Sequence, residues 1–239
     1  MRLRALLLDL DGTLLDLDGD WFLEEYLAAL SEWMAPVVDP GRFAEALWSA
    51  AIPVMVDRAG HAGRSNRDVL WQALSDTLQV DPAVLQERFG VFVDGDLTQI
   101  APGGAAREGA HELVAAGRAG GFKLAVATMP IYPRRVVDER LRRANLQDVP
   151  WDLVATDAME SVKPHPAYYQ ELADRLGVSP PECLMVGDDY FRDIAARRVG
   201  MATAYVGAPQ PGLDTGPAGT LTDWAHRLPA LADGTDWPA

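Results

Sequence analysis

Apolar residues follow two different spacings along the chain, and the spacing changes near residue 100. An apolar run at residues 6–8 leads directly to Asp9 and predicts a short strand buried on both faces. From residue 17 to residue 98 the apolar residues recur at helical spacing, and no segment alternates as a half-buried strand would. Helices are predicted at residues 21–34, 42–55 (broken at Pro53), 68–78 and 82–92, with Asp81 as the N-cap of the last.

After Pro102 short apolar runs alternate with helical patterns. Strands are predicted at residues 123–128, 153–156, 183–187 and 203–206, helices at 105–119, 134–144, 166–176, 191–199 and 222–231, and a loop at 209–217. This alternation is typical of parallel strands joined by right-handed crossovers. We therefore predict an α/β fold with a Rossmann-like parallel sheet and helices on both faces. Residues 1–16 and 99–239 form this core, and residues 17–98 form a helical bundle inserted after the first strand.

Composition limits the function classes. The 239 residues are 49% hydrophobic, enough for a large core. A formal charge of −14 disfavours binding to nucleic acid or to an anionic membrane. Cys183 is the single cysteine, and no apolar run has the length of a signal or transmembrane segment. These features predict a soluble cytoplasmic protein, and they indicate no oligomeric state.

Two carboxylates follow the first strand. Asp9 and Asp11 lie two residues apart, so in an extended chain they point to the same side, and Gly12 then allows a sharp turn. Like charges this close resist joint ionisation unless a cation lies between them. Two interpretations are open at this point: a divalent-metal site with a nucleophilic carboxylate, or an ordinary Asp-Gly turn.

Three more polar features follow later strands of the predicted sheet, whose carboxyl ends meet at one edge. They are Thr128, Lys163, and the acidic group Asp188, Asp189 and Asp193. Each has a structural alternative: a helix N-cap for Thr128, a solvated charge for Lys163, and turn or helix-terminus acids for the aspartates. Four such features at one edge favour a shared site.

Together these motifs resemble the haloacid dehalogenase superfamily of aspartate-nucleophile hydrolases. The resemblance is carried by DLDGT at residues 9–13, Thr128, Lys163 within VKPHP, and GDDYFRD at residues 187–193. Their order and approximate spacing fit the family over nearly the whole chain. The inserted helices look like that superfamily's C1-type cap.

The resemblance implies roles for these residues. Asp9 would attack phosphorus and form an aspartyl-phosphate, and Asp11 would act as general acid and then general base. Mg²⁺ would bind the carboxylates of Asp9 and Asp188 and the backbone carbonyl of Asp11. Thr128 and Lys163 would bind the phosphoryl oxygens. Asp193 would order the metal site or Lys163, and Asp189 would contact a metal-bound water or cap a helix.

Two details refine the expected chemistry. The dehalogenases of the superfamily lack an acid at the position of Asp11, because halide leaves without a proton, so Asp11 favours phosphoryl transfer. Met129-Pro130 stands where the family often has Asn, a residue that can help to position the phosphate or the nucleophile.

Substrate choice is expected to depend on the insertion. A locally basic loop there could bind a carboxylate or a second phosphate, or could simply be solvated. Its polar residues are Arg58, His61, Arg64, Asn66 and Arg67. Trp21, Trp48 and Trp71 are expected in the core of the bundle.

The sequence hypothesis is thus a Mg²⁺-dependent phosphatase acting on a small phosphorylated metabolite. The alternatives are a phosphomutase of the same superfamily, a phospho-accepting receiver, or a regulatory domain without activity.

Overall fold

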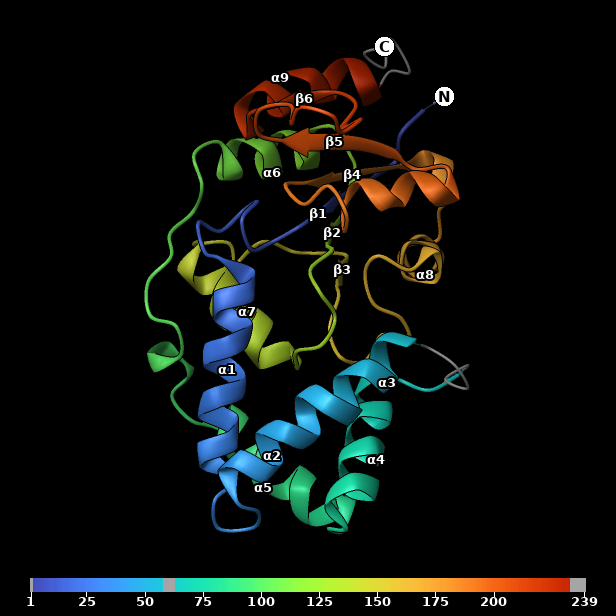
Figure 1. Cartoon of the computed structure of the whole chain (residues 1–239). Coiled ribbons are helices and arrows are strands. Elements are labelled where there is room, and N and C mark those ends of the chain that lie inside the picture. Colours follow the sequence, from blue (N-terminus) through green and yellow to red (C-terminus); the bar gives the residue numbers. More distant parts are fainter. Residues whose placement is uncertain (1, 58–62, 233–239) are drawn as a thin grey trace.

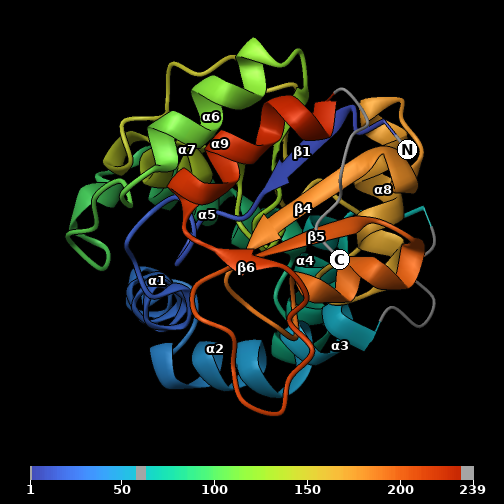
Figure 2. The same ribbon diagram turned by 90° about the horizontal axis from the view of Figure 1, so that it is seen from above.

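A parallel sheet carries the fold (Figures 1 and 2). The computed structural model describes residues 2–57 and 63–232. Its strands are β1 (Ala5–Leu8), β2 (Lys123–Val126), β3 (Leu153–Val154), β4 (Cys183–Gly187), β5 (Ala202–Val206) and β6 (Ala218–Gly219). They lie in the order β3-β2-β1-β4-β5-β6, and every pairing is parallel. The predicted Rossmann-like α/β fold is confirmed.

Side chains of β1 alternate between two apolar layers. Leu6 and Leu8 pack in the layer that contains α6 (Ala110–Ala119), α7 (Arg134–Arg143) and α9 (Leu221–Ala232). Ala5 and Leu7 pack in the opposite layer, against α8 (Pro166–Leu176). Figure 2 shows these helices on the two sides of the sheet. All four side chains of β1 are fully buried, as expected for the central strand of a sheet that is covered on both faces.

In the described part of the chain, five α-helices lie between β1 and α6, the helix that packs on the sheet before β2. They and the adjoining turns are α1 (Gly19–Trp33), α2 (Pro40–Ala46), the π-helix η1 (Leu47–Ala51), α3 (Ile52–Asp57), α4 (Asn66–Leu78), α5 (Pro82–Asp94) and the 3₁₀ turn η2 (Leu97–Gln99). In Figure 1 they occupy the end of the molecule opposite α9. The predicted N-cap of α5 is present, because the Asp81 carboxylate accepts a hydrogen bond from the Ala83 N–H at 2.8 Å. Every helix in the described ranges is too short or too polar to cross a membrane.

The expected break at Pro53 takes a different form. The chain widens into the π-helix η1 before Pro53 and continues as α3, in which Pro53 is the second residue. Proline has no N–H, so an α-helix would leave the Ser49 carbonyl without its donor. The wide turn lets the Ile52 N–H bond the Leu47 carbonyl instead, and α3 then starts at a position that tolerates proline.

Only one of the three tryptophans expected in the helical core is buried there. Trp71 is 2% exposed, whereas Trp21 and Trp48 are 40% and 49% exposed. Phe22 and Tyr26 define the buried face of α1, and Trp21 lies about 100° around the helix from Phe22. The prediction was wrong for Trp21 and Trp48, because helical spacing alone does not say which residues at the edge of a face are covered.

Elsewhere the boundaries differ from the prediction for local reasons. The helix expected from residue 105 begins at Ala110, after Gly109 at φ +83°. Residues 127–128 and 155–156 lie beyond the ends of β2 and β3. The segment expected as a helix at 191–199 is a 3₁₀-helix, η4 (Ile194–Val199), and the short strand β6 was missed because Ala-Gly carries no strand signal.

The environment of Cys183 predicts an inert thiol. Cys183 begins β4, between β1 and β5, and has no exposed surface. Burial raises the pKa of the thiol to about 12, which leaves roughly one molecule in ten thousand as thiolate at pH 8. We expect iodoacetamide at pH 8 to leave the folded protein unmodified and to alkylate it fully in urea, as measured by intact mass. Rapid alkylation of the folded protein would contradict this burial.

Candidate active site

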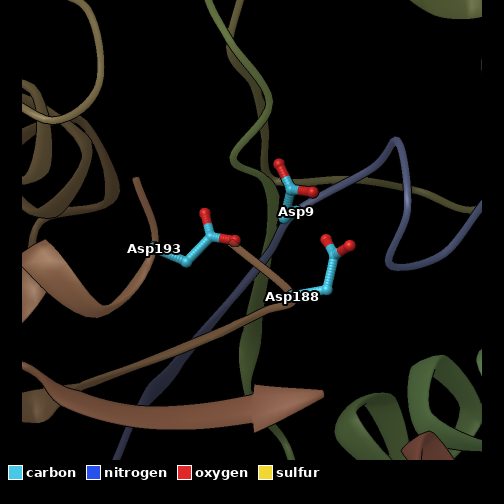
Figure 3. A group of neighbouring side chains, drawn as sticks. All are labelled: Asp9, Asp188 and Asp193. Carbon is cyan, nitrogen blue, oxygen red and sulfur yellow. The ribbon is translucent and has the colours of Figure 1, made fainter. Parts of the chain in front are cut away.

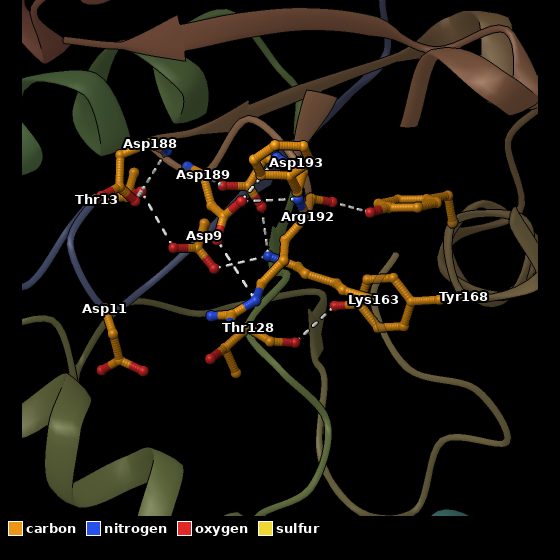
Figure 4. A network of polar contacts seen from close by, with 12 residues as sticks. Asp9, Asp11, Thr13, Thr128, Lys163, Tyr168, Asp188, Asp189, Arg192 and Asp193 are labelled. Carbon is orange, nitrogen blue, oxygen red and sulfur yellow. Dashed lines mark hydrogen bonds and ion pairs between the residues drawn. The ribbon is translucent and has the colours of Figure 1, made fainter. Parts of the chain in front are cut away.

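Polar residues from separate parts of the sequence meet beyond the carboxyl ends of the central strands (Figure 4). Asp9 follows β1 directly, Asp188 follows β4, and Thr128 lies two residues beyond β2. A cavity of about 280 Å³ opens there. Seven of the residues singled out in the sequence line it: Asp9, Asp11, Thr128, Lys163, Asp188, Asp189 and Asp193. The strand order accounts for this meeting, because β1 lies between β2 and β4.

Lys163 lies at the centre of the site. Its ammonium is 2.7 Å from Asp9 Oδ1 and 2.6 Å from Asp193 Oδ1, and its side chain is 2% exposed. Burial opposes protonation of Lys163, but the carboxylates of Asp193 and Asp9 raise its pKa well above the usual value. Lys163 is therefore a charged group within the site, and the alternative of a solvated loop charge is wrong.

Thr13 joins the ends of β1 and β4. Its hydroxyl oxygen lies 2.8 Å from Asp188 Oδ1 and 3.1 Å from Asp9 Oδ2, so it donates its proton to one of these carboxylates at a time. It also accepts a hydrogen bond from the Asp188 N–H at 3.2 Å. No role was predicted for Thr13, although its place within DLDGT was an available signal.

Two glycines make room for the carboxylates. Gly12 has φ +80°, and a Cβ there would collide with the Asp188 carboxylate. A Cβ on Gly187 would collide with the Asp193 carboxylate. Glycine is therefore required sterically beside each strand end, where backbone and acidic side chains approach closely.

Three of the carboxylates form a group with the donor chemistry of a hard cation site (Figure 3). Asp9, Asp188 and Asp193 each offer an oxygen, and these oxygens lie within 4.8 Å of one another. Burial raises the pKa of Asp193 to about 7 against the opposing charge of Lys163, and burial with the charge of Asp9 raises the pKa of Asp188. The single ammonium of Lys163 contacts Asp9 and Asp193 and offsets one of the three negative charges. Mg²⁺, which prefers oxygen ligands, would fit both these carboxylates and the negative charge that remains.

Asp11 faces a different partner. Its carboxylate forms an ion pair with Arg140 of α7, whose side chain is fully buried. The Arg140 guanidinium lies 4.2 Å from the ring centre of Tyr132 and 4.9 Å from that of Phe22. Burial raises the pKa of Asp11, and Arg140 opposes this rise. In Figure 4 the Asp11 carboxylate points away from the group around Lys163.

Arg140 was not among the site residues predicted from the sequence. Five arginines lie in α7, and composition alone does not distinguish them. A usable signal is position, because Arg140 follows Val136 by four residues and precedes Leu141 on the buried face. A charged residue on an apolar face predicts a buried partner.

The loop after β4 holds the remaining acids. Asp189 Oδ1 accepts hydrogen bonds from the N–H groups of Phe191 and Arg192 at 2.8 and 2.9 Å, so Asp189 caps the turn. Asp193 is 1% exposed and holds Lys163, which makes the alternative of an exposed helix-terminus acid wrong. Thr128 is not the N-cap of α7 either, because that helix begins after Pro133.

The described residues of the basic loop lie outside the cavity. Arg67 forms a two-bond ion pair with Asp157 at 2.6 and 2.8 Å, and Arg64 bonds the Asp68 carbonyl in an exposed position. Asn66 donates to the carbonyls of Pro130 and Ser161, both at 3.0 Å. None of these three residues lines the cavity, whereas Met129 does. Arg58 and His61 lie outside the described residues.

A family model described as haloacid dehalogenase-like hydrolase matches residues 3–200, which is most of the chain. The chain belongs to this family. The match includes all four motifs on which the resemblance was based. Residues of these four motifs line the cavity beyond β1, β2 and β4.

Curated relatives within the family carry different substrate names. The pyrophosphatase PpaX of Halalkalibacterium halodurans is 34% identical over 100 residues, 42% of this chain and 46% of that protein. The phosphoglycolate phosphatase of Xanthomonas campestris pv. campestris is 29% identical over 198 residues, 83% of this chain and 80% of that protein. This chain spans about half the length, or less, of the first curated relatives that it matches.

Solved structures of the haloacid dehalogenase-like type share the fold. A phosphatase from Thermococcus onnurineus has a TM-score of 0.53 at 21% identity, covering 98% of this chain and 99% of that one. The L-2-haloacid dehalogenase of Xanthobacter autotrophicus has a TM-score of 0.51 at 20% identity, covering 95% and 98%. Because both activities occur on this fold, the fold alone does not decide between them.

The buried pair of Asp11 and Arg140 predicts a large stability difference between two arginines of α7. Arg140→Met leaves the Asp11 carboxylate buried without its partner, and we expect a loss of about 3–5 kcal/mol in the free energy of unfolding. Arg134→Met removes an exposed pair with Asp138, and we expect a loss of about 0.5 kcal/mol or less. Urea unfolding of both variants measures the difference; equal losses would show that the buried pair does not stabilise the fold.

Proposed function

We propose that this protein is a Mg²⁺-dependent phosphatase that hydrolyses a small phosphorylated metabolite through an aspartyl-phosphate on Asp9. The observation that carries the proposal is the contact between Lys163 and Asp9 at 2.7 Å inside a cavity that Asp11 also lines. A positioned carboxylate, a cation beside it and a second carboxyl group are the parts that phosphoryl transfer to an aspartate requires. The names of the phosphatase relatives support the same activity.

The metal would be held by the carboxylates of Asp9 and Asp188 and by the backbone carbonyl of Asp11. Asp193 belongs to the same acidic group, and its Oδ1 accepts a hydrogen bond from the Lys163 ammonium. Its part is to hold that ammonium in place. When bound, the cation offsets negative charge on the phosphoryl group and on the surrounding acids.

In the first step Asp9 attacks phosphorus, an O–P bond forms, and the ester P–O bond breaks. Asp11 gives its proton to the leaving oxygen, a role favoured by the raised pKa that burial causes. In the second step Asp11 takes a proton from water, whose oxygen attacks the phosphorus and frees Asp9 and inorganic phosphate. Lys163 and Thr128 bind the phosphoryl oxygens during both steps.

Residues 17–98 act in this proposal as a cap domain over a core formed by residues 1–16 and 99–239. Phe22 from α1 packs on Arg140, which holds Asp11, so the insertion contacts the catalytic acid indirectly. Closure of the cap would exclude water while the aspartyl-phosphate forms. The charge of −14 supports a small metabolite rather than a nucleic acid as the partner, and the single cysteine supports a cytoplasmic location.

Phosphate release from a panel of phosphorylated metabolites tests the activity. We expect turnover that requires Mg²⁺, stops on chelation, and falls at least about a thousandfold in Asp9→Asn, which keeps the side-chain size and removes the nucleophile. Undiminished turnover in Asp9→Asn would exclude the mechanism. Isomerisation of a sugar phosphate without phosphate release would favour the phosphomutase, and a stable phosphoprotein would favour a receiver.

Asp11→Asn separates the two steps. p-Nitrophenolate leaves without a proton, so p-nitrophenyl phosphate should still phosphorylate Asp9 in this variant, whereas the water in the second step lacks its base. We expect a burst of about one p-nitrophenolate per protein followed by very slow turnover, read by stopped-flow absorbance. Intact mass should show one added phosphoryl group. Steady turnover at the wild-type rate would exclude Asp11 as the base.

A further inference from the structure

The two positively charged residues of the cavity differ in their exposure to solvent. Among the described residues that line it, Lys163 and Arg192 are the cations. Lys163 is buried and committed to Asp9 and Asp193. Arg192 lies on the loop after β4, and its side chain is 42% exposed, so it sits where the cavity meets solvent. Figure 4 shows it beside Asp189 and Asp193.

Arg192 forms two weak ion pairs, which an anionic ligand could replace. Its Nη2 lies 3.0 Å from Asp20 Oδ1 of α1, and its Nε lies 3.4 Å from Asp189 Oδ2. The Asp20 side chain is 71% exposed, and exposed ion pairs of this kind contribute little stability. A carboxylate or phosphate of a ligand can therefore take the place of Asp20 at low cost, and a guanidinium binds either one through two parallel hydrogen bonds.

The loop holds Arg192 in place for this contact. Asp189 accepts hydrogen bonds from the backbone N–H groups of Phe191 and Arg192, and the Asp189 N–H donates to Asp193 Oδ2 at 3.0 Å. Because Asp193 also binds Lys163, one continuous set of hydrogen bonds links the loop to the floor of the cavity. Little backbone ordering is then needed when a ligand binds, which favours affinity.

The volume of the cavity and the residues that line it limit which ligands can bind to both Lys163 and Arg192. The cavity volume of about 280 Å³ is at the low end of the range for small-molecule sites. Leu17, Leu23 and Ile131 supply apolar surface along its wall. A ligand with a short carbon spacer between two anionic ends matches this arrangement.

We propose that Arg192 binds a second anionic group of the substrate, a carboxylate or a second phosphoryl group, and so selects small phosphorylated compounds with two anionic ends. The proposal rests on the phosphatase function for its substrate, but the binding itself does not require turnover. It places substrate selection on the loop after β4 instead of the basic loop of the insertion, whose described arginines lie outside the cavity.

Binding of three non-hydrolysable phosphonates with Mg²⁺ tests the proposal by calorimetry. Propylphosphonate has an uncharged end, 3-phosphonopropanoate has a carboxylate end, and propane-1,3-bisphosphonate has a second phosphonate. We expect the wild-type protein to bind at least one of the two doubly anionic compounds about 10- to 100-fold more tightly than propylphosphonate. The tighter of the two identifies the second anionic group.

Two variants of the ion pair should shift this preference in opposite directions. Arg192→Gln should weaken binding of the preferred phosphonate about 10- to 100-fold more than binding of propylphosphonate. Asp20→Asn removes the competing carboxylate and should tighten binding of the preferred compound about two- to fivefold. Arg175→Gln is the matched control, because Arg175 is similarly exposed (39%), pairs with Glu171 and lies outside the cavity lining.

Three results would overturn the proposal: equal affinity of the wild-type protein for all three compounds, no binding of any of them, or a parallel loss of affinity for all three in Arg192→Gln. Failure of the phosphatase function gives a different pattern, in which no phosphate is released although the preference for doubly anionic phosphonates depends on Arg192. The two hypotheses are therefore tested separately.

Discussion

The ammonium of Lys163 between Asp9 and Asp193 is the interaction on which the site depends. Buried carboxylates repel one another and lose hydration, so such a group persists only with a compensating cation. Lys163, on a loop far from Asp9 in the sequence, supplies that charge. Its ammonium lies 2.7 Å from Asp9 Oδ1 and 2.6 Å from Asp193 Oδ1. It leaves an excess of negative charge beside Asp188, which is why the same cluster that buries a lysine also fits a divalent cation.

The sheet brings these charges together. With β1 between β2 and β4, the loops that follow the three strands open at one edge. Gly12 and Gly187 then allow the acidic side chains to approach closer than any Cβ would permit. The sheet thus places the acidic residues at one edge, the two glycines leave room for their side chains, and Lys163 offsets part of their negative charge.

Sequence patterns predicted the parts of the molecule whose cause is local. The bounds of α8 and β4 were predicted to the residue, because Pro166, Gly177 and a continuous apolar run mark them. The four motifs were assigned to one edge of the sheet because parallel strands end together. Arg140 and Arg192 were not found, since their partners Asp11 and Asp20 lie far away in the sequence and only the folded chain pairs them. Distance in sequence likewise concealed the pair between Arg67 and Asp157.

Helix α1 contacts the site in two ways. Its Phe22 packs on the guanidinium that holds Asp11, and its Asp20 pairs with Arg192 at the opening of the cavity. Asp11 and Arg192 therefore share one neighbouring helix, although they lie on different loops. A shift of α1 relative to the sheet changes the packing behind Asp11 and the pairing of Arg192 together. Because the pair with Asp20 is exposed and weak, a ligand that replaces Asp20 on Arg192 leaves α1 held by the buried packing of Phe22 on Arg140.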